Sequence, residues 1–191
     1  MVIEIIREAI SVGKKYQIRV DGEAKYRVSG MFVAFLGGKL NVANTVGNTL
    51  AQIERKIYLI RPDYRIVLPS RETFRFRAQS LFRGIYSCVG IDSRYFLYAH
   101  TGLIASIFKS DQQIAALMKG GVAALRGDYY SILADDDTDE LLITCIGIVF
   151  DNYNWAINVR SNGIPTINFG NIIFRKDHPF DETWQPKIKG K

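Results

Sequence analysis

The hydrophobic and polar positions of the first 110 residues alternate with a period of two in many short runs. Residues 16–20 (YQIRV) and 24–28 (AKYRV) both alternate, and Asp21-Gly22 between them is a strong hairpin signal. Residues 73–78 (TFRFRA) alternate most sharply, with the Phe side chains on one side and the Arg side chains on the other. Runs of this kind, separated by turn residues, predict an antiparallel sandwich or barrel.

Residues 111–119 (DQQIAALMK) interrupt this alternating pattern. They combine good helix formers with an acidic start, and Gly120 follows them. The pattern predicts a short helix with Asp111 as its N-cap and Gly120 as its C-terminal stop.

Residues 141–150 (LLITCIGIVF) form the most densely apolar run of the chain, directly after the acidic residues 135–140 (DDDTDE). The run is too short to span a membrane as a helix, which takes about 20 residues. Its β-branched residues favour a strand, and Gly147 costs a helix about 1 kcal/mol relative to Ala. The acidic lead-in favours a helix N-terminus, where negative charge stabilises the helix dipole. The two signals conflict, and on the residues alone the balance favours a strand.

The chain after residue 155 carries mixed signals. Residues 164–169 and 172–174 are candidate strands on either side of Gly170. Residues 178–191 are polar and contain proline, so we expect this end to be loose.

Charge is distributed unevenly along the 191 residues, whose formal net charge is +6. Residues 1–127 hold 19 Lys and Arg residues against 9 Asp and Glu residues, a surplus of 10, while residues 128–191 hold 6 against 10. A basic body suggests an anionic partner such as a lipid headgroup, a nucleic acid or an acidic protein. A merely solvated basic surface is an equally good reading.

The cysteines and the N-terminus indicate a cytoplasmic protein. Cys88 and Cys145 lie in apolar settings without a CxxC motif, as buried thiols do in a reducing compartment. Glu4, Arg7 and Glu8 interrupt the apolar N-terminal stretch, which a secretory signal does not allow. We expect a protein without a transmembrane segment that is at most peripheral to a membrane.

The reactive residues of the chain do not form the patterns typical of catalytic or metal-binding sites. His100 and His178 are isolated from other metal ligands, and residues 135–140 place Glu140 where a calcium loop needs Gly. There is no G-x-S-x-G motif, and Gly37-Gly38-Lys39 lacks P-loop spacing. We therefore expect no enzyme activity, no metal and no cofactor. Nucleic acid is also disfavoured, because the aromatic residues occupy alternating core positions rather than a stacking platform.

Basic residues on neighbouring predicted strands form a candidate site for anions. If the Phe side chains of 73–78 face inward, the Arg side chains that alternate with them face outward. There they can bind phosphate groups through charge-assisted hydrogen bonds. The candidate lipid- or anion-binding residues are Arg55, Lys56, Arg75, Arg77 and Arg83.

The order of these features resembles the tubby-like superfamily, and most of all its LURP-one-related branch of small single-domain proteins. The resemblance covers residues 7–155 and rests on order and spacing rather than on one motif. The matching pieces are residues 12–18 (VGKKYQI), the Asp21-Gly22 hairpin, 35–42 (FLGGKLNV), Gly47-Asn48, 50–53 (LAQI), 61–66 (RPDYRI), 105–107 (ASI), 127–130 (GDYY) and 149–151 (VFD).

The resemblance implies a closed antiparallel barrel of about twelve strands around a central hydrophobic helix near residues 138–152. Residues 1–155 would form the barrel domain and residues 156–191 a partly ordered C-terminal extension, which relatives lack. Tubby domains bind phosphatidylinositol bisphosphate through basic residues on the barrel, so the resemblance implies a non-enzymatic phospholipid-binding function. The alternatives are a protein-interaction scaffold that uses the barrel surface or the C-terminal tail and, more weakly, a small-ligand carrier or an enzyme.

Overall fold

The structure is a computed structural model of the whole chain. It describes residues 1–8, 14–33, 37–56, 63–80, 84–100, 104–120, 129–160 and 178–188. The predicted strands at 164–169 and 172–174 lie outside these residues.

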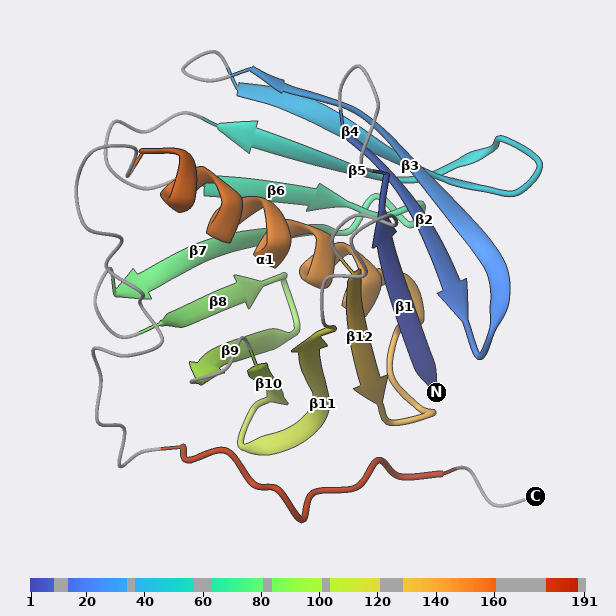
Figure 1. Cartoon of the computed structure of the whole chain (residues 1–191). Coiled ribbons are helices and arrows are strands. Elements are labelled where there is room, and N and C mark those ends of the chain that lie inside the picture. The colour runs from blue at the N-terminus through green and yellow to red at the C-terminus, as the bar shows by residue number, and fades with distance from the viewer. Residues whose placement is uncertain are drawn as a thin grey trace.

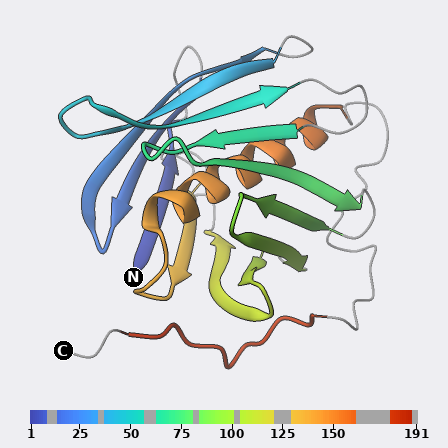
Figure 2. The same ribbon diagram turned by 180° about the vertical axis from the view of Figure 1, so that it is seen from behind.

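Twelve strands within the described residues form one closed barrel (Figures 1 and 2). They are β1 (Val2–Arg7), β2 (Lys14–Val20), β3 (Glu23–Val33), β4 (Gly37–Asn44), β5 (Thr49–Lys56), β6 (Asp63–Val67), β7 (Thr73–Ser80), β8 (Ile85–Val89), β9 (Arg94–His100), β10 (Ile104–Lys109), β11 (Gln112–Lys119) and β12 (Tyr129–Ala134). Each strand pairs antiparallel with the next, and β1 pairs with β12 to close the barrel. The predicted fold class is therefore confirmed.

The alternation of side chains sorts these strands into an inner and an outer face. Phe74 and Phe76 of β7 are buried at 2% and 0% exposure, whereas Arg75 and Arg77, which alternate with them, are exposed. The predicted hairpin is also present, because Val20 pairs with Glu23 across a two-residue turn. Asp21 and Gly22 both have positive φ, 50° and 86°, as a type I′ turn requires.

Helix α1 (Glu140–Arg160) runs through the centre of the barrel (Figure 1). The helical reading of residues 141–150 is correct, and the strand reading is wrong. The inner faces of the strands surround the helix, so its side chains are buried from Leu142 to Tyr153. Enclosure by these strands outweighs the strand preference of Ile143, Ile146 and Ile148. The helix continues to Arg160, beyond the predicted end at 152, so the boundary drawn after residue 155 falls within it.

The acidic lead-in fixes the start of the helix. The Asp139 carboxylate accepts a hydrogen bond from the Leu142 amide at 2.9 Å, as an N-cap residue does. Glu140 accepts hydrogen bonds from the Tyr26 hydroxyl at 2.5 Å and from Lys25 Nζ at 2.6 Å, which tie the first turn to β3. The predicted role of these acidic residues at a helix N-terminus is confirmed.

A buried polar cluster holds the second half of the helix against β2. The Tyr16 hydroxyl donates a hydrogen bond to Asp151 Oδ2 at 2.7 Å and accepts one from Asn152 Nδ2 at 3.1 Å. All three residues are at most 2% exposed. Because a buried carboxylate is stable only with such partners, the cluster fixes how the helix is rotated inside the barrel.

The predicted helix between Asp111 and Gly120 is wrong: residues 112–119 form strand β11. This segment pairs with β10 on one side and β12 on the other, and those pairings complete the barrel wall. Ladder hydrogen bonds and burial override the helix preference of Ala115 and Ala116. A register shift beside Gln113 lets the consecutive residues Ile114 and Ala115 both be buried. Ala116 is buried as well, although it pairs with the outward-facing Ser106.

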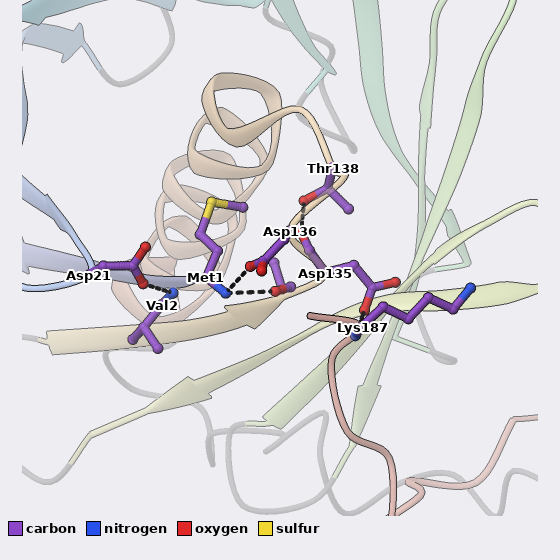
Figure 3. Close-up of polar contacts among 8 residues, drawn as sticks. Met1, Val2, Asp21, Asp135, Asp136, Thr138 and Lys187 are labelled. Carbon is purple, nitrogen blue, oxygen red and sulfur yellow. Dashed lines mark hydrogen bonds and ion pairs between the residues drawn. The ribbon is translucent and has the colours of Figure 1, made fainter. Parts of the chain in front are cut away.

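The C-terminal residues 178–188, expected to be loose, lie along the outside of the barrel, below β9, β10 and β11 in Figure 1, and Figure 2 shows the same arrangement from behind. At Lys187 the main-chain N–H donates to Asp135 Oδ1 at 2.7 Å, and the main-chain carbonyl accepts from the Asp136 amide at 3.0 Å. Figure 3 shows this junction, where Asp136 Oδ1 also lies 2.6 Å from the Met1 amine. These contacts keep this part of the segment on the barrel despite its polar composition.

Candidate anion-binding face

Outward positions of β5, β6 and β7 place charged side chains next to one another. Lys56 of β5 pairs with Asp63 of β6, and Asp63 pairs with Arg77 of β7. At the next outward position, two residues along each strand, Arg65 pairs with Arg75. Since directly paired residues share a face of the sheet, these five side chains form one patch on the outside of the barrel.

Asp63 is the organising residue of this patch. Its carboxylate is buried, and one oxygen, Oδ2, accepts a hydrogen bond from Arg75 Nε at 2.8 Å and another from Arg77 Nε at 3.1 Å. Arg75 also reaches the same oxygen through Nη2. Charge-assisted bonds of this kind hold both guanidinium groups in place. One negative charge is thus shared by two positive charges, which leaves a positive surplus at the surface.

The two arginine side chains remain accessible from solvent. The Arg75 and Arg77 side chains are 47% and 46% exposed, although their shared partner is only 7% exposed. Arg77 contacts the carboxylate through Nε. An incoming anion therefore meets two oriented guanidinium groups at the barrel surface.

Glu54 neutralises part of the neighbouring charge. Its carboxylate lies 3.0 Å from Lys39 Nζ and 3.9 Å from Arg65 Nη1. The outer face from β4 to β7 holds five basic and two acidic residues. The basic residues are Lys39, Lys56, Arg65, Arg75 and Arg77, and the acidic ones are Glu54 and Asp63. The face is mixed in sign but carries a surplus of positive charge.

Arg55 does not belong to this face, contrary to the sequence prediction. It pairs with Tyr64, which is fully buried, and so faces the inside of the barrel next to Ile53 on the same side of β5. Burial raises the pKa of Tyr64, and the positive charge of Arg55 opposes that rise. Adjacent residues of a strand point to opposite faces, so Arg55 and Lys56 cannot both face outward.

The structure therefore brings together Lys56, Arg75 and Arg77 from the predicted set. Arg83 lies outside the described residues. Sequence reasoning missed Asp63, Arg65 and Lys39. The period-two alternation of Asp63-Tyr64-Arg65 could have placed both charged side chains on the same face as Arg75 and Arg77.

A second polar region lies at the end of the barrel where α1 begins. It is a cavity of about 400 Å³ lined by residues that include Tyr95, Lys109, Asp135, Asp137 and Asp139. Asp135 and Asp139 accept the main-chain hydrogen bonds described above, so both are part of the fold. Within the described parts of the chain, no group of three or more His, Cys, Asp or Glu residues is arranged to hold a metal ion.

Both cysteines are buried free thiols, as the sequence predicts. Cys88 on β8 and Cys145 on α1 are each 0% exposed. Burial raises the pKa of both thiols well above the ordinary value, so they are protonated at neutral pH. A protonated, enclosed thiol is a poor nucleophile.

Comparison of this chain with protein-family models, with curated proteins and with solved structures finds no match. Among the described residues there is no helix of sufficient length and apolar character to cross a membrane.

Proposed function

We propose that this chain is a non-enzymatic, tubby-like barrel of the LURP-one-related type that binds anionic phospholipid headgroups, phosphoinositides in particular, at the outer face of β5–β7. It would act in the cytoplasm, at the membrane surface. The observation that carries the proposal is the sharing of the buried Asp63 carboxylate by Arg75 and Arg77, which leaves two exposed, oriented guanidinium groups.

Two features of this arrangement suit phosphate recognition. A guanidinium group presents a planar set of donors that matches the oxygens of a phosphate group. Because Asp63 already orients both side chains, less rotamer freedom is lost when a headgroup binds. Lys56 and Arg65 extend the positive surplus beside them, and anionic membrane surfaces attract clustered basic residues.

The filled barrel interior supports binding at the surface rather than inside. A small-ligand carrier needs an open lumen, whereas here α1 packs against the inner faces of the strands. The interior of this barrel is therefore a packed core along the buried part of the helix.

Sedimentation with liposomes tests the proposal. The full chain is mixed with vesicles of phosphatidylcholine alone, with vesicles that also contain phosphatidylserine, and with vesicles that contain phosphatidylinositol 4,5-bisphosphate at the same total charge. We expect pelleting with the anionic vesicles, most with the phosphoinositide, and a decline as salt is raised. Pelleting with phosphatidylcholine vesicles that equals pelleting with the anionic vesicles would contradict the proposal.

A protein-interaction scaffold is the second candidate, and the contacts of residues 178–188 with the barrel favour it. A segment that docks on its own barrel identifies a surface suited to protein. Deletion of residues 178–191 separates the two candidates: headgroup binding at β5–β7 should persist, whereas a function that requires the tail should be lost.

A further inference from the structure

The outer face of β9 and β10 is unusually rich in aromatic rings. Tyr95 and Leu97 of β9 and Ile107 of β10 face the core, so the alternate positions on these two strands face outward. Outward positions in paired register hold Phe96 opposite Phe108, Tyr98 opposite Ser106 and His100 opposite Ile104. We call these six residues the aromatic face. A strand that is apolar on both faces needs cover on both sides.

Residues 178–188 supply part of that cover. The His178 ring lies 4.3 Å from the Tyr98 ring and 4.9 Å from the Phe108 ring, between centroids. The Phe180 ring lies 5.4 Å from the His100 ring. His100 is itself held by a 2.9 Å hydrogen bond between its Nε2 and Ser106 Oγ. Ser106 is only 1% exposed although it faces outward.

The spacing of these contacts matches an extended peptide to a strand. His178 and Phe180 are two residues apart, and so are their partners Tyr98 and His100. Two residues of extended chain advance about 6.6 Å, the same repeat that separates outward side chains on one strand. An extended segment with rings at alternate positions therefore sets each ring beside a ring of β9.

Near its other end, the segment is held by backbone hydrogen bonds. Lys187 contributes its main-chain N–H and carbonyl, while its side chain is exposed. The partners are the carboxylate of Asp135, which is 1% exposed, and the amide of Asp136. Backbone recognition of this kind accepts many side chains, so the rings carry the specificity.

We propose that the aromatic face, together with the Asp135-Asp136 anchor, is a docking surface for a protein segment that carries two ring side chains at alternate positions, and that residues 178–188 occupy it in cis. Ordering an eleven-residue segment that forms neither helix nor strand has an entropic cost, which opposes the contacts that the segment makes. The cis segment is therefore displaceable, and a partner segment of the same chemistry takes its place. This docking surface is separate from the charged outer face of β5–β7.

The test uses the full chain and a fluorescein-labelled peptide with the sequence of residues 178–188, followed by fluorescence anisotropy. The first variant is Lys187→Pro, which removes the N–H that Asp135 accepts; Lys187→Ala is its matched control, because it keeps that N–H. The second variant is His178→Ala/Phe180→Ala, which removes both rings from the cis segment. All these changes lie in the segment and leave the strand ladder of the barrel unchanged.

Both weakened variants should bind the peptide more tightly than the original chain does, by roughly fivefold or more, because a larger fraction of molecules has an open docking surface. Lys187→Ala should bind as the original chain does. A peptide with Ser in place of His178 and Phe180 should lose binding. Hydrogen exchange at the Asp136 amide reports opening independently, since the Lys187 carbonyl is its acceptor.

Three results would overturn the proposal. The first is faster exchange at Asp136 without tighter peptide binding, which would show an open surface that does not dock the segment. The second is unchanged exchange in both weakened variants, which would show that these contacts do not hold the segment. The third is equal binding of the peptide without rings.

Discussion

At the scale of single residues, Gly147 is a point of close approach between α1 and the barrel wall. A Cβ atom at this position would lie 2.6 Å from Ile5 Cδ1 and 2.7 Å from Ile132 Cδ1. The glycine costs the helix about 1 kcal/mol in propensity, yet it lets β1 and β12 pack directly against the helix backbone. Close packing explains why a poor helix former occupies the middle of the central helix.

We predict that Gly147→Ala lowers the free energy of unfolding by about 1 kcal/mol, because an overpacking loss of about 1–3 kcal/mol exceeds the gain in helix propensity. In an Ile5→Val/Ile132→Val background, which lacks both Cδ1 atoms, the same substitution should cost nothing or stabilise. Urea denaturation of the four proteins measures the coupling. Additive losses would contradict the close approach.

Tyr16 is the second residue with a specific structural role. Tyr16→Phe removes the hydroxyl that donates to the buried Asp151 carboxylate. We predict a loss of about 2–3 kcal/mol at neutral pH, the usual value of a hydrogen bond to a buried charged group. Tyr129→Phe is the matched control, since the Tyr129 hydroxyl donates to Glu4 at the half-exposed outer surface and its loss should cost less than about 1 kcal/mol.

The same residue shapes the alkaline limit of stability. Burial, and then the negative charge of Asp151, raise the pKa of Tyr16 well above its ordinary value of 10.0. Above pH 10 the unfolded phenol loses its proton while the folded one keeps it, so stability falls as pH rises. The fall should be shallower in Tyr16→Phe than in the original chain. Parallel pH profiles of the melting temperature between pH 8 and 11.5 would contradict this assignment.

At the scale of elements, the acidic residues before α1 divide into those that build the helix start and those that do not. Asp139 caps the helix through the Leu142 amide, whereas Asp137 lies two residues further from the helix start; both residues are exposed. Asp139→Ala should lower the free energy of unfolding by about 1 kcal/mol, the usual effect of losing an N-cap. Asp137→Ala removes the same charge nearby and should have less than half that effect. Equal losses would mean that only charge near the helix dipole matters.

The sequence predicted some of these elements correctly and others wrongly. The alternation in residues 73–78 and the Asp21-Gly22 turn predicted β7 and the β2–β3 hairpin, because each pattern is local. The prediction of a helix at residues 112–119 was wrong because helix preference takes no account of strand pairing. Here the segment pairs with β10 across the two-residue turn at 110–111, and with β12 on its other side. Residues 141–150 needed the resemblance, since only the surrounding barrel makes an all-apolar, β-branched helix stable.

The candidate face could be predicted in part for the same reason. Arg75 and Arg77 follow from the alternation around two buried Phe residues. Their joint contact with Asp63 depends on the register between β6 and β7, which the sequence does not reveal. Arg55 was placed on the wrong face because neighbouring basic residues were taken together, against the alternation of a strand.

At the scale of the whole molecule, closure of the barrel encloses both thiols. Cys88 and Cys145 are 0% exposed, one on the wall and one on the helix. We predict that a thiol reagent at pH 8 modifies both only when the barrel unfolds, so that the two sites react at the same rate and the rate rises with denaturant. In strong denaturant both should react at once. Fast modification of either cysteine without denaturant would contradict an enclosed core.

The central claim is that the outer face of β5–β7 binds anionic headgroups. Two double variants remove equal charge: Lys56→Gln/Arg77→Gln on this face, and Arg19→Gln/Arg27→Gln on β2 and β3, where both residues are exposed. Arg75 remains in the first variant and keeps the buried Asp63 carboxylate paired. Each basic residue at an anionic surface contributes about 1 kcal/mol.

The decisive measurement is the affinity of these two variants for vesicles that contain phosphatidylinositol 4,5-bisphosphate, titrated at constant salt. We predict that Lys56→Gln/Arg77→Gln weakens binding by roughly tenfold or more, because two charges near the surface contribute about 2 kcal/mol. Arg19→Gln/Arg27→Gln should weaken it by less than about twofold. Equal losses in the two variants would show that net charge alone attracts the protein, and would contradict a headgroup site on β5–β7.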